Sequence, residues 1–176
     1  MKKAVFLDRD GTINEDVGDL YEIQNVRFIP GAIEAMKRLA KEYSLFIVTN
    51  QSGIGKGVFD LEQYGIFERE YNALLEREGV HIVETYCCPH RKDQPCVCRK
   101  PSPHYMTVAS ERHGIDLSRS FAVGDHPHDI EMGRNAGSRT VYLLTGHGER
   151  HKGELVIPPD HIAGNLAEAA EWICSL

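Results

Sequence analysis

Short apolar runs alternate with amphipathic stretches along the whole chain. Residues 4–7 and 44–48 are rich in strand-forming side chains, and 80–86, 121–124 and 139–144 follow the same pattern. Because each run is separated from the next by a stretch with helical periodicity or by a long loop, the pattern predicts a mainly parallel sheet with helices on both faces. We therefore expect a doubly wound, Rossmann-like α/β fold.

The amphipathic stretches carry recognisable helix boundaries. A helix is expected after Pro30-Gly31, and a capping box from Asp60 to Gln63 predicts a second helix that ends before Gly79. Ser102 as N-cap with Pro103 at the first position begins a third helix, residues 130–136 form a short one, and a capping box from Asn165 to Glu168 opens the last. The following positions are predicted to face the core: Ile33, Met36, Leu39, Leu61, Tyr64, Phe67, Tyr71, Leu74, Leu166, Ala169 and Ile173.

Three segments show no sustained period. Residues 13–28 form a loop of functional length, and the alternating glycines of 53–57 predict a mobile connection whose N–H groups could approach an anion. The loop of 145–153 contains His147 and His151, which either suggest a second metal site or are solvated loop residues. No insertion is long enough to form a cap domain, so specificity is expected to come from short loops.

Composition narrows the class of protein. The chain has 176 residues, 41% of them hydrophobic and 26% charged, which suits a single domain spanning 1–176. A net charge of -6 argues against nucleic-acid binding, which needs a basic surplus. No segment is apolar enough to span a bilayer or to act as a signal peptide. We predict a cytoplasmic monomer without membrane association.

Carboxylates follow two of the predicted strands directly. Asp8 and Asp10 come after the first strand, and Asp125 follows the fourth. The pair could simply end a strand and begin a turn. In a parallel sheet, however, the three acids would meet at one edge, where their oxygens suit a hard cation such as Mg²⁺.

A second strand end and the segment after the cysteines add the remaining parts of a phosphoryl-transfer site. Thr49, at the end of the second strand, offers a hydroxyl group, and Arg99 or Lys100 offers positive charge. Thr49 alone could equally make a local hydrogen bond. Together with the acids, these residues provide a nucleophile, a metal site, an acid/base and an anion clamp for a small phosphorylated metabolite.

Cysteines are crowded into one short segment. His90, Cys96 and Cys98 lie close to the adjacent pair Cys87 and Cys88, which matches the spacing of a Cys₃His zinc site. Free thiols are the alternative. Such a zinc loop, residues 87–99, would be structural, and it would position the cations that follow it.

The ordered motifs Asp8-Arg-Asp10-Gly-Thr, Thr49-Asn-Gln-Ser, Arg99-Lys100-Pro and Gly124-Asp125 resemble those of the haloacid dehalogenase (HAD) superfamily of phosphatases. More narrowly, Phe-Leu-Asp-Arg-Asp-Gly-Thr-Ile-Asn14, Val-Thr-Asn-Gln-Ser-Gly-Ile54 and Cys-Arg-Lys-Pro101 resemble the D-glycero-D-manno-heptose 1,7-bisphosphate phosphatases and the related histidinol-phosphate phosphatases. The resemblance spans residues 4 to about 145.

This resemblance implies roles for individual residues. Asp8 would be the nucleophile that forms an aspartyl-phosphate, and Asp10 the acid/base. Mg²⁺ would be held by Asp8, the backbone carbonyl of Asp10 and Asp125, with Asp129 in support, while Thr49 and Lys100 bind the phosphoryl group. The zinc ligands would be Cys88, rather than Cys87, with His90, Cys96 and Cys98. Further residues expected to contact the substrate are Arg9, Asp16, Asp19, Asn50, Gln51, Ser52, Arg99 and His126.

Two positions depart from the pattern of the heptose-bisphosphate phosphatases. His126 stands where these enzymes commonly have a lysine, so it is either a ligand for the second phosphate or an exposed loop histidine. The loop at Asp16 lacks the aromatic residue that usually follows its glycine. The expected activity is removal of the 7-phosphate of the heptose bisphosphate. The alternatives are histidinol phosphate or another small sugar phosphate as substrate, or a catalytically silent zinc-bearing module that binds phosphate.

Overall fold

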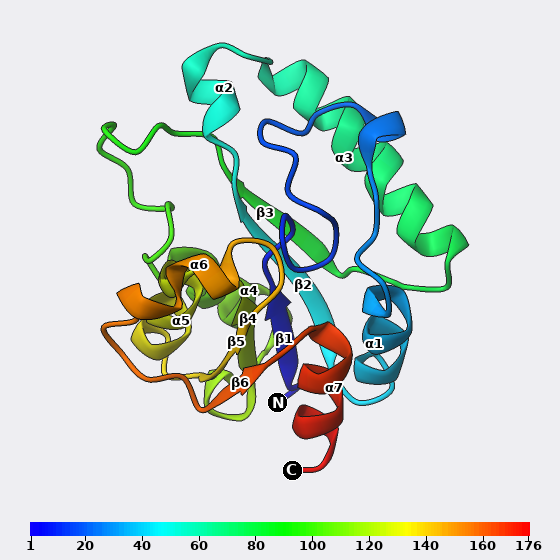
Figure 1. Ribbon diagram of the computed structural model, residues 1–176, viewed down its shortest axis with the longest axis vertical. Coiled ribbons are helices and arrows are strands. Elements are labelled where there is room, and N and C mark those ends of the chain that lie inside the picture. Colours follow the sequence, from blue (N-terminus) through cyan, green and yellow to red (C-terminus); the bar gives the residue numbers. More distant parts are fainter.

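A six-stranded parallel sheet forms the centre of the protein in a computed structural model that describes all of residues 1–176 (Figure 1). The strand order is β3-β2-β1-β4-β5-β6, and every neighbouring pair is parallel. This is the doubly wound, Rossmann-like topology that the alternating pattern predicted. The strands are β1 (Ala4–Leu7), β2 (Ser44–Asn50), β3 (Glu84–Cys88), β4 (Phe121–Gly124), β5 (Arg139–Leu143) and β6 (His161–Ala163).

Helices cover both faces of this sheet. The connections contain α1 (Ala32–Leu39), α2 (Ser52–Lys56), α3 (Leu61–Arg77), α4 (His104–His113), α5 (Pro127–Asn135), α6 (Gly148–His151) and α7 (Leu166–Cys174), with short 3-10 turns at Ile23–Asn25, Leu117–Arg119 and Lys152–Glu154. Helices α1, α3 and α7 pack on one face, and α4 and α5 pack on the other (Figure 1). None of the helices is long and apolar enough to cross a membrane.

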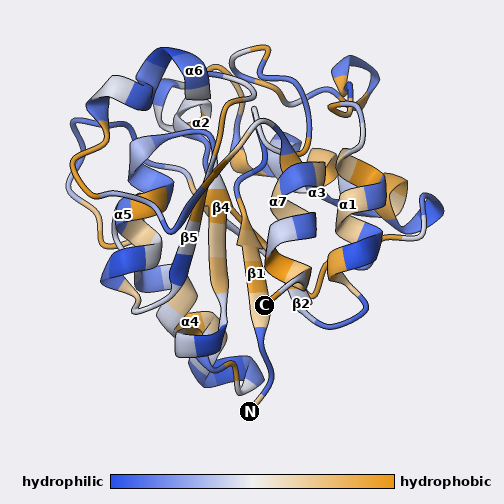
Figure 2. Cartoon of the chain, turned by 60° about the horizontal axis from the view of Figure 1, so that its bottom comes forward, coloured by the Kyte–Doolittle hydropathy of each residue, from blue (hydrophilic) through white to orange (hydrophobic).

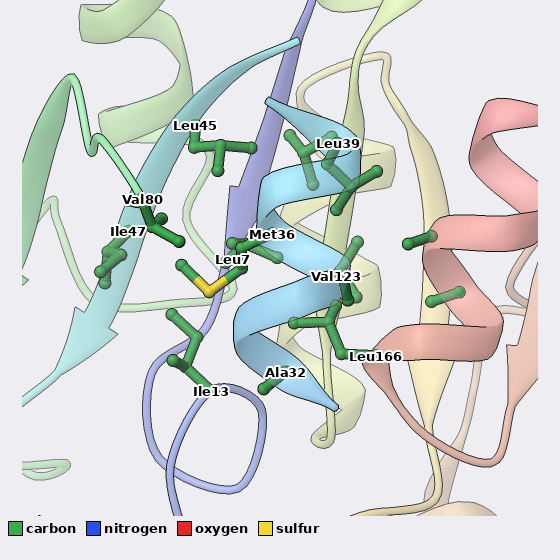
Figure 3. Close-up of a cluster of buried hydrophobic side chains, with 14 of the residues drawn as sticks. Leu7, Ile13, Ala32, Met36, Leu39, Leu45, Ile47, Val80, Val123 and Leu166 are labelled. Atoms are coloured by element: carbon green, nitrogen blue, oxygen red, sulfur yellow. The ribbon is translucent and has the colours of Figure 1, made fainter. Parts of the chain in front are cut away.

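Alternate side chains of β1 divide the interior into two cores. Val5 and Leu7 belong to the larger core beneath α1, α3 and α7, whereas Ala4 and Phe6 belong to the smaller core beneath α4 and α5. All four are fully buried because β1 is a central strand. Figure 3 shows part of the larger core, where Met36 of α1 lies among side chains of the sheet.

Hydropathy follows this layering. In Figure 2 the central strands β1 and β4 are hydrophobic along most of their length, whereas the surrounding helices combine both colours. The helices are therefore amphipathic covers, and their polar faces are turned away from the sheet.

Several predicted boundaries were wrong. The third strand begins at Glu84 instead of residue 80, and β6 was not predicted at all. The N-cap of α4 is Pro103 rather than Ser102, and the loop of 145–153 contains α6. Leu61 is 65% exposed, because it occupies the first turn of α3 before that helix reaches the core. The last capping box is only half formed, since the Glu168 carboxylate accepts from Gly164 N instead of from the N-cap.

The glycines of residues 53–57 do not form the mobile connection that was predicted. They lie in and directly after the short helix α2. A Cβ atom at Gly53 would collide with the Phe59 ring and would also lie 2.8 Å from an Asp19 oxygen, and one at Gly55 would lie 2.9 Å from the backbone nitrogen of Arg91. Gly53 and Gly55 therefore allow close packing against residues that lie distant in the sequence.

The sheet topology brings the first and fourth strands together. β1 pairs with β2 on one side and with β4 on the other, so the order reverses between β1 and β4. Ligands of open α/β sheets bind at the carboxyl ends of strands beside such a reversal. Asp8 and Asp125 directly follow these two strands, so this edge of the sheet is the place to look for a functional site.

Candidate active site

A cavity of about 330 Å³ opens at the carboxyl ends of the central strands, and hydrophobic side chains are absent from its lining. Nearly all of the predicted site residues meet there, although they come from distant parts of the chain. The lining residues are Asp8, Asp10, Asp16, Gly18, Asp19, Thr49, Asn50, Gln51, Ser52, Arg99, Lys100, Asp125, His126, His128, Asp129 and His147.

Three buried carboxylates form the floor of this cavity. Asp8, Asp125 and Asp129 each offer an oxygen atom, and these oxygens all lie within 4.8 Å of one another. Burial, reinforced by the neighbouring acids, raises the pKa of Asp8 well above its usual value despite the opposing effect of Lys100. Burial and Asp129 likewise raise the pKa of Asp125 to about 6. The cluster is thus electrostatically unfavourable without additional positive charge.

Lys100 provides part of that charge. Its Nζ donates to Asp8 Oδ1 and to Asp129 Oδ1, both at 2.6 Å, and to the carbonyl oxygen of Val48 at 3.0 Å. Burial alone would lower the pKa of Lys100, but the two carboxylates outweigh this effect and raise it. Three acceptors face the three ammonium hydrogens, so the predicted contact with a phosphoryl group requires the exchange of at least one of them.

Backbone packing fixes the orientation of Asp125. Its Oδ2 accepts a hydrogen bond from His147 N at 2.7 Å. A Cβ atom at Gly11 or Gly146 would collide with the same carboxylate, and both glycines have positive φ angles. The Asp-Gly-Thr segment and the loop after β5 therefore hold Asp125 between them.

The floor of the cavity fits a divalent cation of the magnesium type. Three carboxylates and one ammonium group leave an excess of negative charge in a buried place, and all the potential ligands are hard oxygen atoms. Asp129, which was expected only to support the site, belongs to this cluster. The side chain of Asp10 does not.

The Asp10 carboxylate is instead hydrogen-bonded by its neighbours. Arg9 donates from Nε to Oδ1 at 3.1 Å and from Nη2 to Oδ2 at 2.8 Å. Asn14 Nδ2 donates to Oδ1 at 2.9 Å, and Gln51 Nε2 donates to Oδ2 at 3.0 Å. The carboxylate thus lies beside the acidic cluster in one defined orientation.

Arg9 does not lie where a substrate-binding residue would. Its side chain is only 2% exposed, does not line the cavity and packs over the rings of Phe67 and Tyr71. Burial alone would lower the pKa of Arg9, but the Asp10 carboxylate raises it. The structure therefore does not place Arg9 in the cavity wall, and sequence order could not show that this side chain points into the core beneath α3.

Residues at the end of β2 and directly after it also line the cavity. Thr49 Oγ1 accepts a hydrogen bond from Gln51 Nε2 at 2.8 Å, and Asn50 Oδ1 accepts one from Lys100 N at 3.2 Å. Ser52 is the first residue of α2 and also faces the cavity. These residues therefore add hydroxyl and amide groups to the lining of the cavity.

Histidines surround the mouth of the cavity. His126 caps α5, since its Nδ1 accepts from His128 N, while Asp129 accepts from His126 N. Burial, together with the neighbouring His128, lowers the pKa of His126 to about 4. His126 is consequently neutral at pH 7 and does not replace the constant charge of a lysine.

His147 and His128 were missed as lining residues. His147 Nε2 lies 3.1 Å from Asp16 Oδ2, so this histidine is paired with a carboxylate of the loop that follows β1. His151 pairs separately with Glu154 at 2.8 Å. Only the glycines beside His147 hinted at its position, because its partner is more than a hundred residues away in the sequence.

Cationic side chains extend from the cysteine-rich loop and from the end of α2. Arg99 lines the cavity and donates from Nη1 to the carbonyl oxygen of His90 at 2.9 Å. Lys56 Nζ lies 3.7 Å from the Asp19 carboxylate on the other side. Arg99 therefore connects the cavity physically to the cysteine-rich loop.

That loop brings three sulfur atoms and one imidazole together. Cys88 Sγ lies 3.6 Å from His90 Nδ1 and 3.8 Å from Cys96 Sγ, and Cys98 Sγ lies 3.5 Å from His90 Nδ1. A tetrahedral zinc site has S–S edges of about 3.8 Å and S–N edges of about 3.6 Å. The arrangement therefore fits zinc, and Cys87 lies outside the cluster.

An acid-bearing loop after β1, a hydroxyl group at the end of β2, a buried lysine and an acidic pair after β4 define a HAD-like hydrolase. In agreement, a family model described as HAD-hyrolase-like matches residues 97–169. Similarity to proteins named as phosphatases extends over most of the chain, as the following relatives illustrate.

The chain is 42% identical over 154 residues to the D-glycero-beta-D-manno-heptose-1,7-bisphosphate 7-phosphatase of Pasteurella multocida, which covers 83% of this chain and 84% of the relative. It is 36% identical over 154 residues to the D-glycero-alpha-D-manno-heptose-1,7-bisphosphate 7-phosphatase of Photorhabdus laumondii, which covers 82% of this chain and 84% of the relative. The crystal structure of the D,D-heptose 1,7-bisphosphate phosphatase of B. bronchiseptica with magnesium and phosphate has a TM-score of 0.90, 29% identity and 98% coverage of both chains. The protein belongs to the heptose-1,7-bisphosphate 7-phosphatase family and is a phosphatase.

Proposed function

We propose that the protein removes the 7-phosphate of D-glycero-D-manno-heptose 1,7-bisphosphate by way of an aspartyl-phosphate on Asp8. The observation that carries this proposal is the carboxylate cluster of Asp8, Asp125 and Asp129 with Lys100, at the floor of an entirely polar cavity. A cavity without apolar side chains suits a substrate that is covered with hydroxyl and phosphate groups.

In the first half-reaction, an Asp8 oxygen attacks phosphorus and the bond between phosphorus and the sugar oxygen breaks. Asp10 gives a proton to the departing oxygen, which keeps the electron pair of the broken bond. In the second, Asp10 takes a proton from water, which attacks the same phosphorus and releases phosphate from Asp8. Lys100 and Thr49 bind the phosphoryl oxygens during both steps.

Two metals accompany this chemistry. Mg²⁺ would be held by Asp8, Asp125, Asp129 and the backbone carbonyl of Asp10. Its positive charge would reduce the repulsion between these carboxylates and a phosphoryl group. Cys88, His90, Cys96 and Cys98 would hold Zn²⁺ in a structural role. In this proposal residues 1–176 act as one domain, with the zinc loop at 87–99.

The substrate's second phosphate would lie toward the mouth of the cavity. Arg99 is the cation available there, together with neutral His126 and His128 as hydrogen-bond partners. Asp16 and Asp19 would receive hydrogen bonds from sugar hydroxyl groups. Since relatives are named for both anomers of the heptose bisphosphate, both anomers belong in the test.

The test is phosphate release from the two heptose-bisphosphate anomers, histidinol phosphate and 4-nitrophenyl phosphate with Mg²⁺ present. We expect the highest kcat/KM for one heptose-bisphosphate anomer, and an Asp8→Asn variant that is folded but slower by on the order of 10⁴-fold. Higher activity on histidinol phosphate would contradict the substrate. An Asp8→Asn protein with full activity would contradict the covalent mechanism.

A further inference from the structure

The Asp10 carboxylate is connected to the long helix α3 by a chain of buried side chains. Asn14 Nδ2 donates to Asp10 Oδ1, and Asn14 Oδ1 accepts a hydrogen bond from the Tyr71 hydroxyl group at 2.8 Å. Tyr71 lies near the middle of α3 and is only 2% exposed. Residues far apart in the sequence thus meet behind the proposed acid/base.

The orientation of the Asn14 amide is fixed by its surroundings. Its Nδ2 faces two acceptors, Asp10 Oδ1 and the carbonyl oxygen of Glu15, each at 2.9 Å. Its Oδ1 must then face a donor, and Tyr71 supplies one. Burial raises the pKa of the Tyr71 hydroxyl above its usual value, so this group stays protonated. The chain of donors therefore runs in one direction, toward Asp10.

Arg9 completes the support from the same side. Its two donors engage both Asp10 oxygens, and its Nη2 also donates to the carbonyl oxygen of Leu20 at 3.3 Å. The guanidinium lies 4.9 Å from the centre of the Phe67 ring and 5.9 Å from that of Tyr71. A planar fork packed against aromatic rings has little freedom to rotate.

Only one of the donors to Asp10 belongs to the cavity wall. Gln51 lines the cavity, whereas Arg9 and Asn14 do not. The four donor contacts use all four acceptor positions of the Asp10 carboxylate. Because Gln51 is the only donor that a substrate in the cavity can reach, only its hydrogen bond to Oδ2 can be exchanged for one with a substrate. The supporting groups thus leave Oδ2 as the oxygen that exchanges a proton with the substrate.

We propose that Tyr71, acting through Asn14, and Arg9 are positioning residues that aim Asp10 Oδ2 at the leaving-group oxygen. This inference rests on the proposed function, because it requires Asp10 to be the acid/base. Removal of the Tyr71 hydroxyl group leaves Asn14 free to rotate and loosens Asp10. Proton transfer to the leaving group then suffers, while attack by Asp8 does not.

The experiment compares kcat/KM for a sugar phosphate and for 4-nitrophenyl phosphate, since kcat/KM covers the steps up to release of the first product. A nitrophenolate departs with little help from an acid, whereas a sugar alkoxide needs a proton. For Tyr71→Phe we expect a loss of about 10-fold with heptose bisphosphate and less than about twofold with the aryl ester, as befits partial loss of general-acid catalysis. Arg9→Lys, which keeps the charge but not the fork, should show the same selectivity.

Two controls separate the possible failures. Tyr86 belongs to the smaller core, and its hydroxyl group donates to the Glu84 carboxylate. Tyr86→Phe therefore removes a comparable hydrogen bond away from Asp10, and it should change kcat/KM for neither substrate. Asp10→Asn should show the largest selective loss on the sugar phosphate. If it does not, the acid/base assignment in the proposed function is wrong. If Asp10→Asn behaves as expected but Tyr71→Phe and Arg9→Lys lower both substrates equally, or neither, the positioning role is refuted.

Discussion

The acidic cluster and the cysteine cluster lie at the same end of the sheet, yet they are held together in different ways. Asp8 and Asp125 directly follow buried central strands, and hydrogen bonds and close-packed glycines restrict their side chains. Residues 91–95 of the cysteine loop are all exposed and have no strand or helix. The first site is thus formed by buried strand ends, whereas the exposed part of the cysteine loop is held at its base, by Cys88 at the end of β3 and by the hydrogen bond from Arg99 to His90.

Lys100 joins the two regions. It follows Cys98 and Arg99 in the chain, and its ammonium group lies between Asp8 and Asp129. A loop with little packing therefore delivers the cation on which the rigid site depends. We therefore expect the cysteine loop to affect catalysis through the placement of Lys100. The first two predictions below test this expectation, and the third tests the charge balance of the acidic cluster itself.

Lys100→Met should have the largest effect. It removes the cation shared by Asp8 and Asp129 and one donor to the phosphoryl group, so we expect kcat/KM to fall by about 10²- to 10³-fold. Phosphate release and far-UV circular dichroism are the measurements. Lys92→Met, in the exposed part of the same loop, is the matched control and should behave as the unchanged protein. A Lys100→Met loss below about twofold would mean that Lys100 has no part in the reaction.

Removal of zinc should have an intermediate effect. A Cys96→Ser, Cys98→Ser protein should contain no zinc and lose about 10- to 100-fold in activity, because Lys100 is less well placed, while Mg²⁺ still binds. Metal analysis, phosphate release and Mg²⁺ titration give the three readouts. Cys87→Ser should keep its zinc, because Cys87 lies outside the cluster. Unchanged turnover in a zinc-free double variant would show that the acidic site does not depend on the loop.

Acidification should have the smallest effect, and only on the acidic site. The pKa of Asp125 is raised to about 6 in the folded protein, whereas the ordinary pKa of an aspartate is near 4. Between about pH 4 and pH 6, Asp125 is therefore protonated in the folded protein and ionised in the unfolded chain. Without Mg²⁺, stability contributed by protonated Asp125 is present at low pH and is lost as the pH rises through this window.

The measurement is the Tm of magnesium-free protein at pH 5 and at pH 7.5, compared with that of Asp125→Asn. The difference in Tm, variant minus unchanged protein, should be larger at pH 7.5, and Mg²⁺ should stabilise only the unchanged protein there. The subtraction removes the effects of acids elsewhere in the chain. An identical difference in Tm at both pH values would show that ionised Asp125 does not destabilise the folded protein.

The sequence by itself determined the features that depend on neighbouring residues. Alternation of apolar runs and amphipathic stretches predicted the parallel sheet, and five of its six strands were located. Asp8, Asp125 and Thr49 were predicted at strand ends because a strand's end is visible in the sequence. The cluster of Cys88, His90, Cys96 and Cys98, proposed to bind zinc, was also predictable because its members lie within eleven residues.

Only the tertiary structure decided which side chains face which. Arg9 turns into the core because α3 presents aromatic rings there, Asp129 joins the acidic cluster, and His147 reaches both Asp125 and Asp16. Gly53 and Gly55 serve close contacts instead of mobility. These outcomes depend on contacts between residues tens to more than a hundred positions apart, and local periodicity contains no information about such contacts.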